Sequence, residues 1–254
     1  SPQLEGEEMP IEISGFKGGD RTNIELPKVQ RNFLKALKEA GKKVVFVNCS
    51  GSAIALTPET ESCDAILQAW YPGQEGGEAV ARVLFGEYNP AGKLPITFYK
   101  NSEQLPDFKD YSMKGRTYRY MNDALFPFGY GLSYTSFRMG DATLSNSILK
   151  KGEKITLKVP VSNVGKKDGT EIVQVYVKDP TDADGPLKSL KAFERVEVKA
   201  GKTAEAVITL DSKNFELFDA ATNTVRAKAG NYEVYYGNSS ADKDLKKIMV
   251  NYEY

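Results

Sequence analysis

Two short apolar segments in the first half of the chain constrain its fold more than any other feature. Residues 44–48 (VVFVN) and 65–70 (AILQAW) are apolar runs without alternation, which is typical of strands buried on both faces of a parallel sheet. Between and around them, helices are predicted over 28–40, with Gly41 as its stop, and over 78–85, because apolar residues recur there at helical spacing. Alternating strands and helices predict an α/β layer architecture.

These strands are too few to make a stable covered sheet. A third extended stretch is predicted at 94–99 (LPITFY), after a Pro-Ala-Gly turn. Even three strands would leave open edges with unpaired backbone groups. We therefore expect the sheet to be completed by polypeptide upstream of Ser1 or by a partner, a homo-oligomer included. The chain also lacks an initiator methionine, a signal peptide and a targeting tail, and we expect it to be a piece of a longer protein.

The second half of the chain changes character near residues 130–138. Helical patterns fade, and short alternating runs follow, separated by turn sequences such as GKKDG and DADGP. About seven short strands over roughly 115 residues predict an immunoglobulin-like β-sandwich. Charged residues at the alternate positions predict a solvated outer face, with Ile172 and Tyr176 on the face opposite the valines of their strand. The residues predicted to face inward are Ile155, Leu157, Val159, Val161, Val173, Val175 and Val177.

The chain contains no histidine, and this excludes several chemistries. A Ser-His-Asp triad, a His-ligated zinc site and a Cys-His nucleophile pair all need that side chain. The two cysteines, Cys49 and Cys63, are too few for a zinc cluster or a disulfide framework. Both are predicted to be small buried apolar side chains. Any acid–base chemistry has to come from carboxylates or tyrosines.

Charge and hydropathy exclude further classes of function. Lys+Arg and Asp+Glu both number 34, so the net charge is zero and predicts neither nucleic-acid binding nor attraction to an acidic membrane. The sequence has no apolar run long enough to span a bilayer. The glycine-rich stretch 72–77 (PGQEGG) precedes a helix but lacks the Lys-Ser/Thr of a phosphate-binding loop. No metal site is predicted.

The N-terminal sequence SPQLEGEEMP places Glu5, Glu7 and Glu8 within four residues. On composition alone, such a cluster is most often a group of solvated charges. Neighbouring carboxylates also raise one another's pKa, which suits a general acid that must hold its proton near neutral pH. The residues alone leave both interpretations open.

Several long stretches taken together resemble the C-terminal part of family 3 glycoside hydrolases. They are GGDRTNIELPKVQ, VVFVNCSGSAIAL, AILQAWYPGQEGGEAVARVLFGEYNPAGKLPITF, GRTYRY and LFPFGYGLSYTSF. The resemblance covers most of residues 1–137, and the remainder is similar to the fibronectin type III-like domain that often ends such enzymes. It implies an α/β fold, part of an α/β sandwich domain over 1–133, followed by an all-β fibronectin III-like sandwich over 134–254. The family's N-terminal (β/α)8 barrel, which carries the nucleophilic Asp, is absent.

The resemblance also implies an activity. Family members are retaining, exo-acting β-glycosidases that remove sugars from the non-reducing ends of oligosaccharides, and this chain looks like part of a β-xylosidase or β-glucosidase that needs no cofactor. Without the barrel, the chain alone is predicted to be inactive. A periplasmic or secreted location is implied, with its signal upstream. The alternative is a non-catalytic, carbohydrate-associated or scaffolding module.

Site residues follow from the same motifs. Leu-Glu-Gly-Glu resembles the family's xylosidase-like acid/base loop, which implies that Glu5 is the acid/base, with Glu7 as its rival. Asp20 and Arg21 match an Asp-Arg pair downstream of that loop; they are either a turn with an ion pair, or Arg21 orders the loop. Trp70 and Tyr71 are either a sugar platform or rings buried beneath a loop at a strand end. The tyrosines of RTYRY are predicted to pack between domains.

Overall fold

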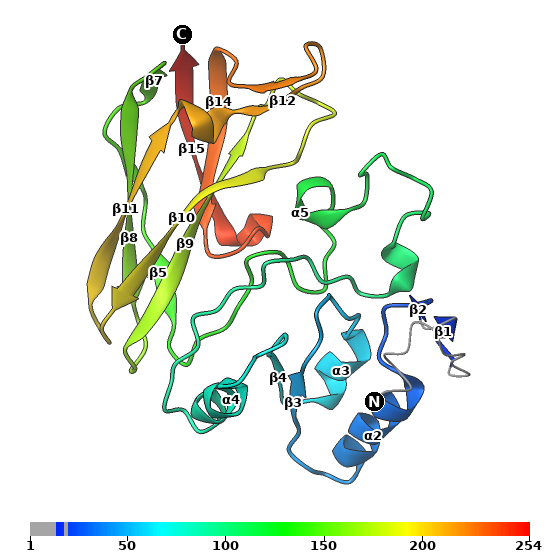
Figure 1. Ribbon diagram of the computed structural model, residues 1–254. Helices are drawn as coiled ribbons and strands as arrows, with labels where there is room; N and C mark the ends of the chain where they lie inside the picture. Colours follow the sequence, from blue (N-terminus) through cyan, green and yellow to red (C-terminus); the bar gives the residue numbers. More distant parts are fainter. Residues whose placement is uncertain (1–13, 18–19) are drawn as a thin grey trace. The chain divides into compact units, whose positions relative to one another are not determined.

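The computed structural model describes residues 14–17 and 20–254. Figure 1 shows the chain, which divides into two compact units. Unit 1 contains the described residues up to Ala81 together with Thr97–Arg116 and Asp123–Phe126. Unit 2 contains Arg82–Ile96, Thr117–Asn122 and Pro127–Tyr254. Each unit is described by itself below.

Unit 1 is built around a parallel pair of strands, β3 and β4. Val45–Asn48 of β3 pairs in register with Ala65–Gln68 of β4, and no other strand extends this sheet among the described residues. The predicted α/β character and the incomplete sheet are therefore confirmed. The remaining elements of this part of the chain are the strands β1 (Phe16–Lys17) and β2 (Asp20–Arg21), the helices α2 (Lys28–Glu39), α3 (Thr57–Ser62) and α4 (Gly76–Leu84, which runs on into unit 2), and the 3₁₀ turn η1 (Ser102–Gln104).

The first helix and the two strands lie close to their predicted positions. Apolar residues at helical spacing form α2, but only Leu34 of this helix is buried. Gly41 follows with φ +69°, a conformation that glycine adopts without strain, so the predicted stop is correct. The third extended stretch does not join the sheet; it forms a single antiparallel bridge between Phe98 and Phe126. The prediction of a third strand was therefore wrong.

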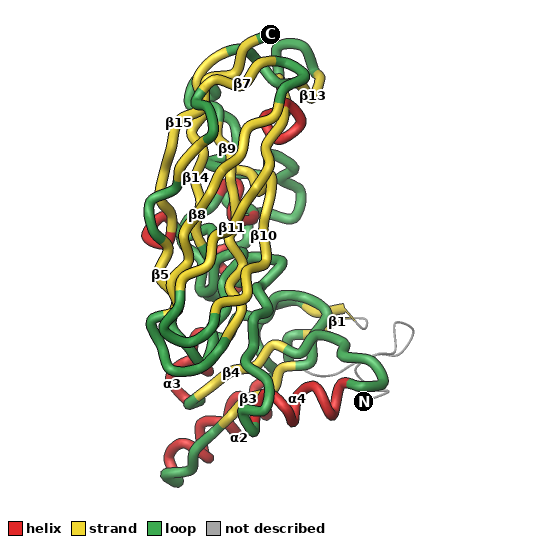
Figure 2. Tube along the Cα trace, turned by 90° about the vertical axis from the view of Figure 1, so that its left-hand side faces the viewer, coloured by secondary structure: helices red, strands yellow, loops and turns green. Residues whose placement is uncertain are grey.

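Unit 2 contains a β-sandwich of two sheets. One sheet has the order β10-β9-β14-β15-β7 and the other the order β11-β8-β5, with β6 also paired to β8. Figure 2 shows these strands, in yellow, running side by side. The elements are β5 (Phe137–Met139), β6 (Thr143–Leu144), β7 (Ile148–Lys150), β8 (Lys154–Asn163), β9 (Gly169–Lys178), β10 (Ser189–Val198), β11 (Thr203–Asp211), η2 (Ser212–Phe215), β12 (Leu217–Asp219), β13 (Thr224–Arg226), β14 (Gly230–Gly237), η3 (Asp242–Asp244) and β15 (Leu245–Glu253), preceded by helix α5 (Thr117–Tyr120).

The core of the sandwich follows the alternation of the sequence. Every residue predicted to face inward in β8 and β9 is at most 2% exposed, because side chains two apart lie on the same face of a strand. The outer face of β9 does not fit the prediction, however, since Gln174 and Tyr176 are buried there too. Tyr118 of α5 stacks on Phe128 at 4.4 Å between ring centroids and meets Tyr176 edge-on at 5.7 Å. An aromatic layer therefore replaces the predicted solvent on this face.

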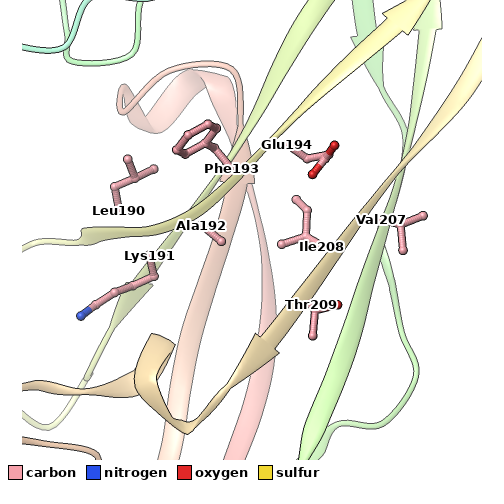
Figure 3. Close-up of a pocket in the computed structure, with 8 residues that line it drawn as sticks. All are labelled: Leu190, Lys191, Ala192, Phe193, Glu194, Val207, Ile208 and Thr209. Atoms are coloured by element: carbon pink, nitrogen blue, oxygen red, sulfur yellow. The ribbon is translucent and has the colours of Figure 1, made fainter.

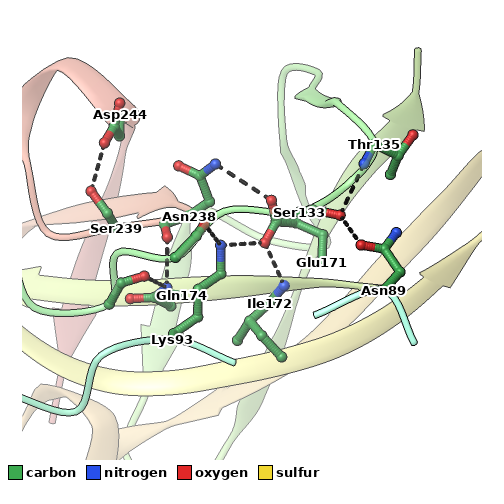
Figure 4. A network of polar contacts seen from close by, with 12 residues as sticks. Asn89, Lys93, Ser133, Thr135, Glu171, Ile172, Gln174, Asn238, Ser239 and Asp244 are labelled. Atoms are coloured by element: carbon green, nitrogen blue, oxygen red, sulfur yellow. Dashed lines mark hydrogen bonds and ion pairs between the residues drawn. The ribbon is translucent and has the colours of Figure 1, made fainter. Parts of the chain in front are cut away.

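A buried polar network attaches the chain before residue 134 to the sandwich strands (Figure 4). The ammonium of Lys93 pairs with Glu171 at 2.8 Å, and the two side chains are 13% and 5% exposed. The Asn89 side chain accepts from Ser133 and donates to the carbonyl of Asp168. Residues 82–96 consequently belong to the compact unit of the sandwich, as do residues 117–122, whose Tyr118 packs on Tyr176. The division of the chain at residues 133 and 134 stays a prediction about domains.

The two cysteines have different environments. Cys63 is buried after α3, as predicted, but Cys49 is exposed just beyond the end of β3, so that half of the prediction was wrong. Residue 49 lies in the loop that leaves the carboxyl end of the strand, where side chains are not held inside the sheet. Within the residues that the structure covers, no helix is long and apolar enough to cross a membrane.

Candidate functional site

Glu5 and Glu7 lie outside the described residues. The nearest described part of the predicted site is the hairpin of β1 and β2, in which Phe16 pairs with Arg21 and Lys17 with Asp20. Its base is closed by a hydrogen bond of 2.8 Å from the backbone of Thr22 to the carbonyl of Gly15. Gly15 has φ +95°, so this end of the hairpin requires a glycine. The hairpin therefore has a defined local structure.

Arg21 ties the hairpin to the chain that follows it. Its guanidinium donates to the backbone carbonyl of Glu25 and lies over the ring of Phe16, 5.9 Å from the centroid. Burial lowers the pKa of Arg21, and the carboxylate of Glu25 partly opposes that shift. Asp20 is exposed on the second strand. The contacts of Arg21 therefore join the hairpin to Glu25. Its role toward the acid/base loop stays a prediction, because that loop lies outside the described residues.

Glu25 and Ser102 hold the other side of this arrangement, and sequence reasoning missed both. The carboxylate of Glu25 accepts from the backbone N–H of Ser102 at 2.8 Å and from its hydroxyl at 2.5 Å. The same hydroxyl accepts from the backbone N–H of Ile24 at 3.0 Å. Burial alone would raise the pKa of Glu25, but the two hydrogen bonds from Ser102 outweigh it and hold the pKa below its ordinary value. Glu25 lies within the stretch GGDRTNIELPKVQ, but nothing in the sequence indicates a partner 77 residues away.

Trp70 and Tyr71 follow the carboxyl end of β4 and have different surroundings. Trp70 is half-buried, with its ring edge-on to the buried Phe98 at 6.2 Å between centroids. Its φ of +56° is rare for a bulky residue and marks local strain, which often lies at functional sites. Tyr71 is 79% exposed. Its ring lies against Gly51, where an added Cβ would stand 2.6 Å from Cε2. Trp70 is thus a half-buried ring packed on Phe98, whereas Tyr71 presents its ring to solvent. A sugar contact for either residue stays a prediction.

Polar side chains also meet at the carboxyl ends of β3 and β4. The amide of Asn48 donates to Gln68 at 2.6 Å and to the hydroxyl of Ser50 at 3.0 Å, and Gln68 donates to the carbonyl of Ser50. Ligands of open α/β sheets bind outside this edge of the sheet. Here the three side chains satisfy one another, so their observed role is to fix the loop that carries Gly51 beneath Tyr71.

The described residues do not hold a group of three or more His, Cys, Asp or Glu side chains that could bind a metal ion. Glu25 accepts two hydrogen bonds from Ser102, so its carboxylate joins two segments of unit 1. This part of the site can therefore position a loop and offer an aromatic surface. Glycoside hydrolysis with retention needs two carboxyl groups about 5–5.5 Å apart, and Glu25 with its described neighbours does not form such a pair.

A separate pocket lies in the sandwich, between the edge strands β10 and β11 (Figure 3). Glu194 supplies its only carboxylate, so the pocket cannot provide the pair that glycoside hydrolysis needs. The ammonium of Lys191 is already bonded to the carbonyl of Glu216. The pairing of β10 also shifts register between Leu190 and Ala192. A bulge and charged side chains protect an open sheet edge from pairing with another strand. The lining residues are Leu190, Lys191, Ala192, Phe193, Glu194, Val207, Ile208 and Thr209.

The fold and the motifs together define a glycoside hydrolase part, an α/β unit followed by a fibronectin-like sandwich. Family comparison agrees: residues 1–134 match the model of the glycosyl hydrolase family 3 C-terminal domain, and residues 171–240 match a fibronectin type III-like domain. The chain belongs to the glycosyl hydrolase family 3 C-terminal domain family. The resemblance inferred from the motifs is confirmed.

Individual relatives point to the same family. The chain is 65% identical over 250 residues to a xylan 1,4-beta-xylosidase of Xylanibacter ruminicola. The aligned region covers 98% of this chain and 29% of that protein. It is 38% identical to a periplasmic beta-glucosidase of Salmonella typhimurium, over 89% of this chain and 31% of the relative. The crystal structure of a Listeria innocua beta-glucosidase in complex with isofagomine superposes with a TM-score of 0.79 at 31% identity, over 94% of this chain and 35% of that one. The chain therefore spans about a third of the length of these relatives.

Proposed function

We propose that this chain is the C-terminal portion of a retaining, exo-acting β-glycosidase, a β-xylosidase or β-glucosidase that hydrolyses sugars at the non-reducing ends of oligosaccharides. The observation that carries the proposal is the 65% identity, over nearly the whole chain, to a protein named as a xylan 1,4-beta-xylosidase. That name favours a xyloside over a glucoside as the substrate. In this proposal, residues 1–133 are part of the α/β sandwich domain and residues 134–254 are the fibronectin III-like domain.

The proposed catalytic role of the chain is to supply the general acid/base. Retention requires two carboxyl groups about 5–5.5 Å apart, one as nucleophile and one as acid/base. We assign the acid/base to Glu5, with Glu7 as the rival, and the nucleophile to a (β/α)8 barrel in the remainder of the longer protein. Glu5 would protonate the glycosidic oxygen as the bond breaks and then deprotonate the water that releases the sugar. Arg21 would order the hairpin that follows the acid/base loop, and the exposed ring of Tyr71 is the better candidate for a sugar contact than Trp70.

The location follows by analogy alone. A relative is named as a periplasmic beta-glucosidase, and we propose a periplasmic or secreted location for the longer protein that contains this chain. The proposed substrate is an oligosaccharide, and the proposed structural partner is the barrel.

The proposal is tested on the full-length enzyme with Glu5→Ala and Glu7→Ala. General acid–base assistance is typically worth about 10²–10⁴-fold, so Glu5→Ala should lose about that much on xylo-oligosaccharides. The loss should shrink on aryl-xylosides with very acidic leaving groups, which depart without a proton, and azide should restore turnover. The same selective rescue in Glu7→Ala, with near-normal activity of Glu5→Ala, would transfer the role to Glu7. If neither change affects activity, the acid/base is another residue.

A further inference from the structure

Residues 24 and 25, which follow the hairpin, are hydrogen-bonded to Ser102 in a distant part of unit 1. Ser102 begins the 3₁₀ turn η1, and it exchanges hydrogen bonds with residues 24 and 25 in both directions. Its N–H and hydroxyl donate to the Glu25 carboxylate, and its hydroxyl accepts from the Ile24 N–H. A carboxylate that accepts two donors from one residue fixes both the distance and the orientation of the two segments.

The hairpin is bonded to the backbone of Glu25. Arg21 donates to the carbonyl of Glu25, so the side chain of Glu25 is bonded to η1 while its backbone is bonded to the hairpin. The carbonyl of Ile24 also accepts from the N–H of Ala55 at 2.8 Å. The chain next to the hairpin therefore lies between two fixed neighbours, and Ser102 is the one that reaches it through a side chain.

We propose that Glu25 and Ser102 are positioning residues for glycoside hydrolysis: they hold the Asp20–Arg21 hairpin, and through it the end of the chain that leads from Glu5. This inference rests on the proposed function, because it needs an acid/base in the N-terminal segment. Neither side chain touches substrate in the proposal. They set the place from which the acid/base loop departs.

The physical reason is that proton transfer depends steeply on geometry. A misplacement of about 1 Å can cost about 10²-fold in rate, even when the change lies away from the reacting atoms. Ser102→Ala removes the hydroxyl that bonds both Glu25 and Ile24 but leaves the backbone N–H that donates to Glu25. The hairpin should therefore shift without detaching. We expect kcat to fall by about tenfold, which is less than the about 10²-fold loss for a full 1 Å misplacement.

The test uses the full-length enzyme and aryl-xylosides whose leaving groups range from weakly to strongly acidic. Ser102→Ala should lower kcat by about tenfold for weakly acidic leaving groups and by less than about twofold for strongly acidic ones, because only the former need a well-placed proton. Ser102→Thr keeps a hydroxyl and should retain most of the activity. Glu25→Ala should show the same selectivity as Ser102→Ala, because it removes the other half of the same contact.

Thr57→Val is the matched control. The Thr57 hydroxyl donates to the carbonyl of Lys100 at 2.7 Å, so it holds the same segment as Ser102 but does not contact the hairpin. Thr57→Val should lower kcat equally for all leaving groups or not at all. A uniform loss in Ser102→Ala, with a thermal midpoint lowered as in Thr57→Val, would show a merely structural role and overturn the inference.

Glu5→Ala, measured beside these variants, separates the two proposals. If Glu5→Ala shows the leaving-group selectivity and Ser102→Ala does not, the acid/base assignment stands and the positioning role is wrong. If neither variant is selective, the acid/base assignment fails, and the positioning role fails with it.

Discussion

The two units of this chain bury their apolar residues to very different extents. In unit 2, residues such as Leu157 and Val175 are completely buried between two sheets. In unit 1, the sheet has only two described strands, and Val29, Phe33 and Val45 are 75%, 62% and 51% exposed. The same kind of sequence pattern, apolar residues at regular spacing, thus produces a closed core in one unit and an open face in the other.

The spacing of apolar residues in a segment and the completeness of the core around them are therefore separate properties. A sandwich of this kind brings both of its sheets in one stretch of sequence, so its apolar faces cover one another. A parallel sheet is built from strands that are distant in sequence. Helices that pack on its faces stay partly exposed when some of those strands are missing. We therefore expect unit 2 to be stable by itself and unit 1 to be less so.

The largest expected effect comes from the buried ion pair of unit 2. Glu171→Gln removes the negative charge that pairs with the ammonium of Lys93, at a site where the two side chains are only 13% and 5% exposed. The ammonium keeps a neutral partner, the carbonyl of Gly131 at 3.2 Å, but has lost its counter-charge. Breaking such a pair by changing one member typically costs about 3–5 kcal/mol. Urea unfolding of unit 2, followed by hydrogen exchange of the β8 and β9 amides, measures this loss.

Lys158→Met is the control for that change. The pair of Lys158 with Glu205 lies on the sandwich surface, where the side chains are 51% and 46% exposed. Exposed pairs contribute about 0–1 kcal/mol. Equal losses in Glu171→Gln and Lys158→Met would show that segment 82–96 does not contribute to the stability of the sandwich.

A pH dependence of unit 2 is the next effect. Burial alone would raise the pKa of Asp179, but hydrogen bonds from Thr181 and Lys228 hold it below its ordinary value. A carboxyl with a depressed pKa in the folded state contributes stability that is present above its unfolded pKa and is lost as the pH falls through the folded pKa. Unit 2 should therefore lose urea resistance below about pH 4. Asp179→Asn should be less stable at neutral pH and should show a shallower loss in acid; an unchanged slope would remove Asp179 from this role.

The smallest expected effect concerns the open face of unit 1. Phe33 is 62% exposed, so Phe33→Ser should change stability by no more than about 0.5 kcal/mol. Its neighbour Leu34 is 8% exposed, and Leu34→Ser should cost about 2 kcal/mol or more. Trp70 is the only tryptophan of the chain and lies in unit 1, so its fluorescence follows this unfolding. A large loss of stability in Phe33→Ser would mean that another surface covers this face of unit 1.

The sequence predicted those parts of the fold that depend on local spacing. The alternation of β8 and β9, the helix α2 and the strands β3 and β4 all appear near their predicted positions, because each is set by side chains within one segment. The third strand was wrong, and the solvated outer face of β9 was wrong, because Phe126, Tyr118 and Phe128 reach these segments from elsewhere in the chain. Such contacts leave no periodic trace in either partner.

The candidate site divides in the same way. The motif containing Asp20 and Arg21 was recognisable, and so was the pair Trp70 and Tyr71, since all four lie in long family motifs. The contact of Ser102 with Glu25 was not recognisable from the sequence, because it joins positions 77 residues apart. The assignments of Glu5 and Glu7 fall outside the described residues and stay predictions.

Native-state hydrogen exchange of this chain tests the difference between the two units most directly. Peptides that cover α2, β3 and β4 report unit 1, and peptides that cover β8, β9 and β14 report unit 2. We predict that the first set exchanges through openings of lower free energy than the second, so that unit 1 loses protection at urea concentrations where unit 2 keeps it. Loss of protection in both sets at the same urea concentration would contradict this account and would mean that the chain unfolds as one cooperative body.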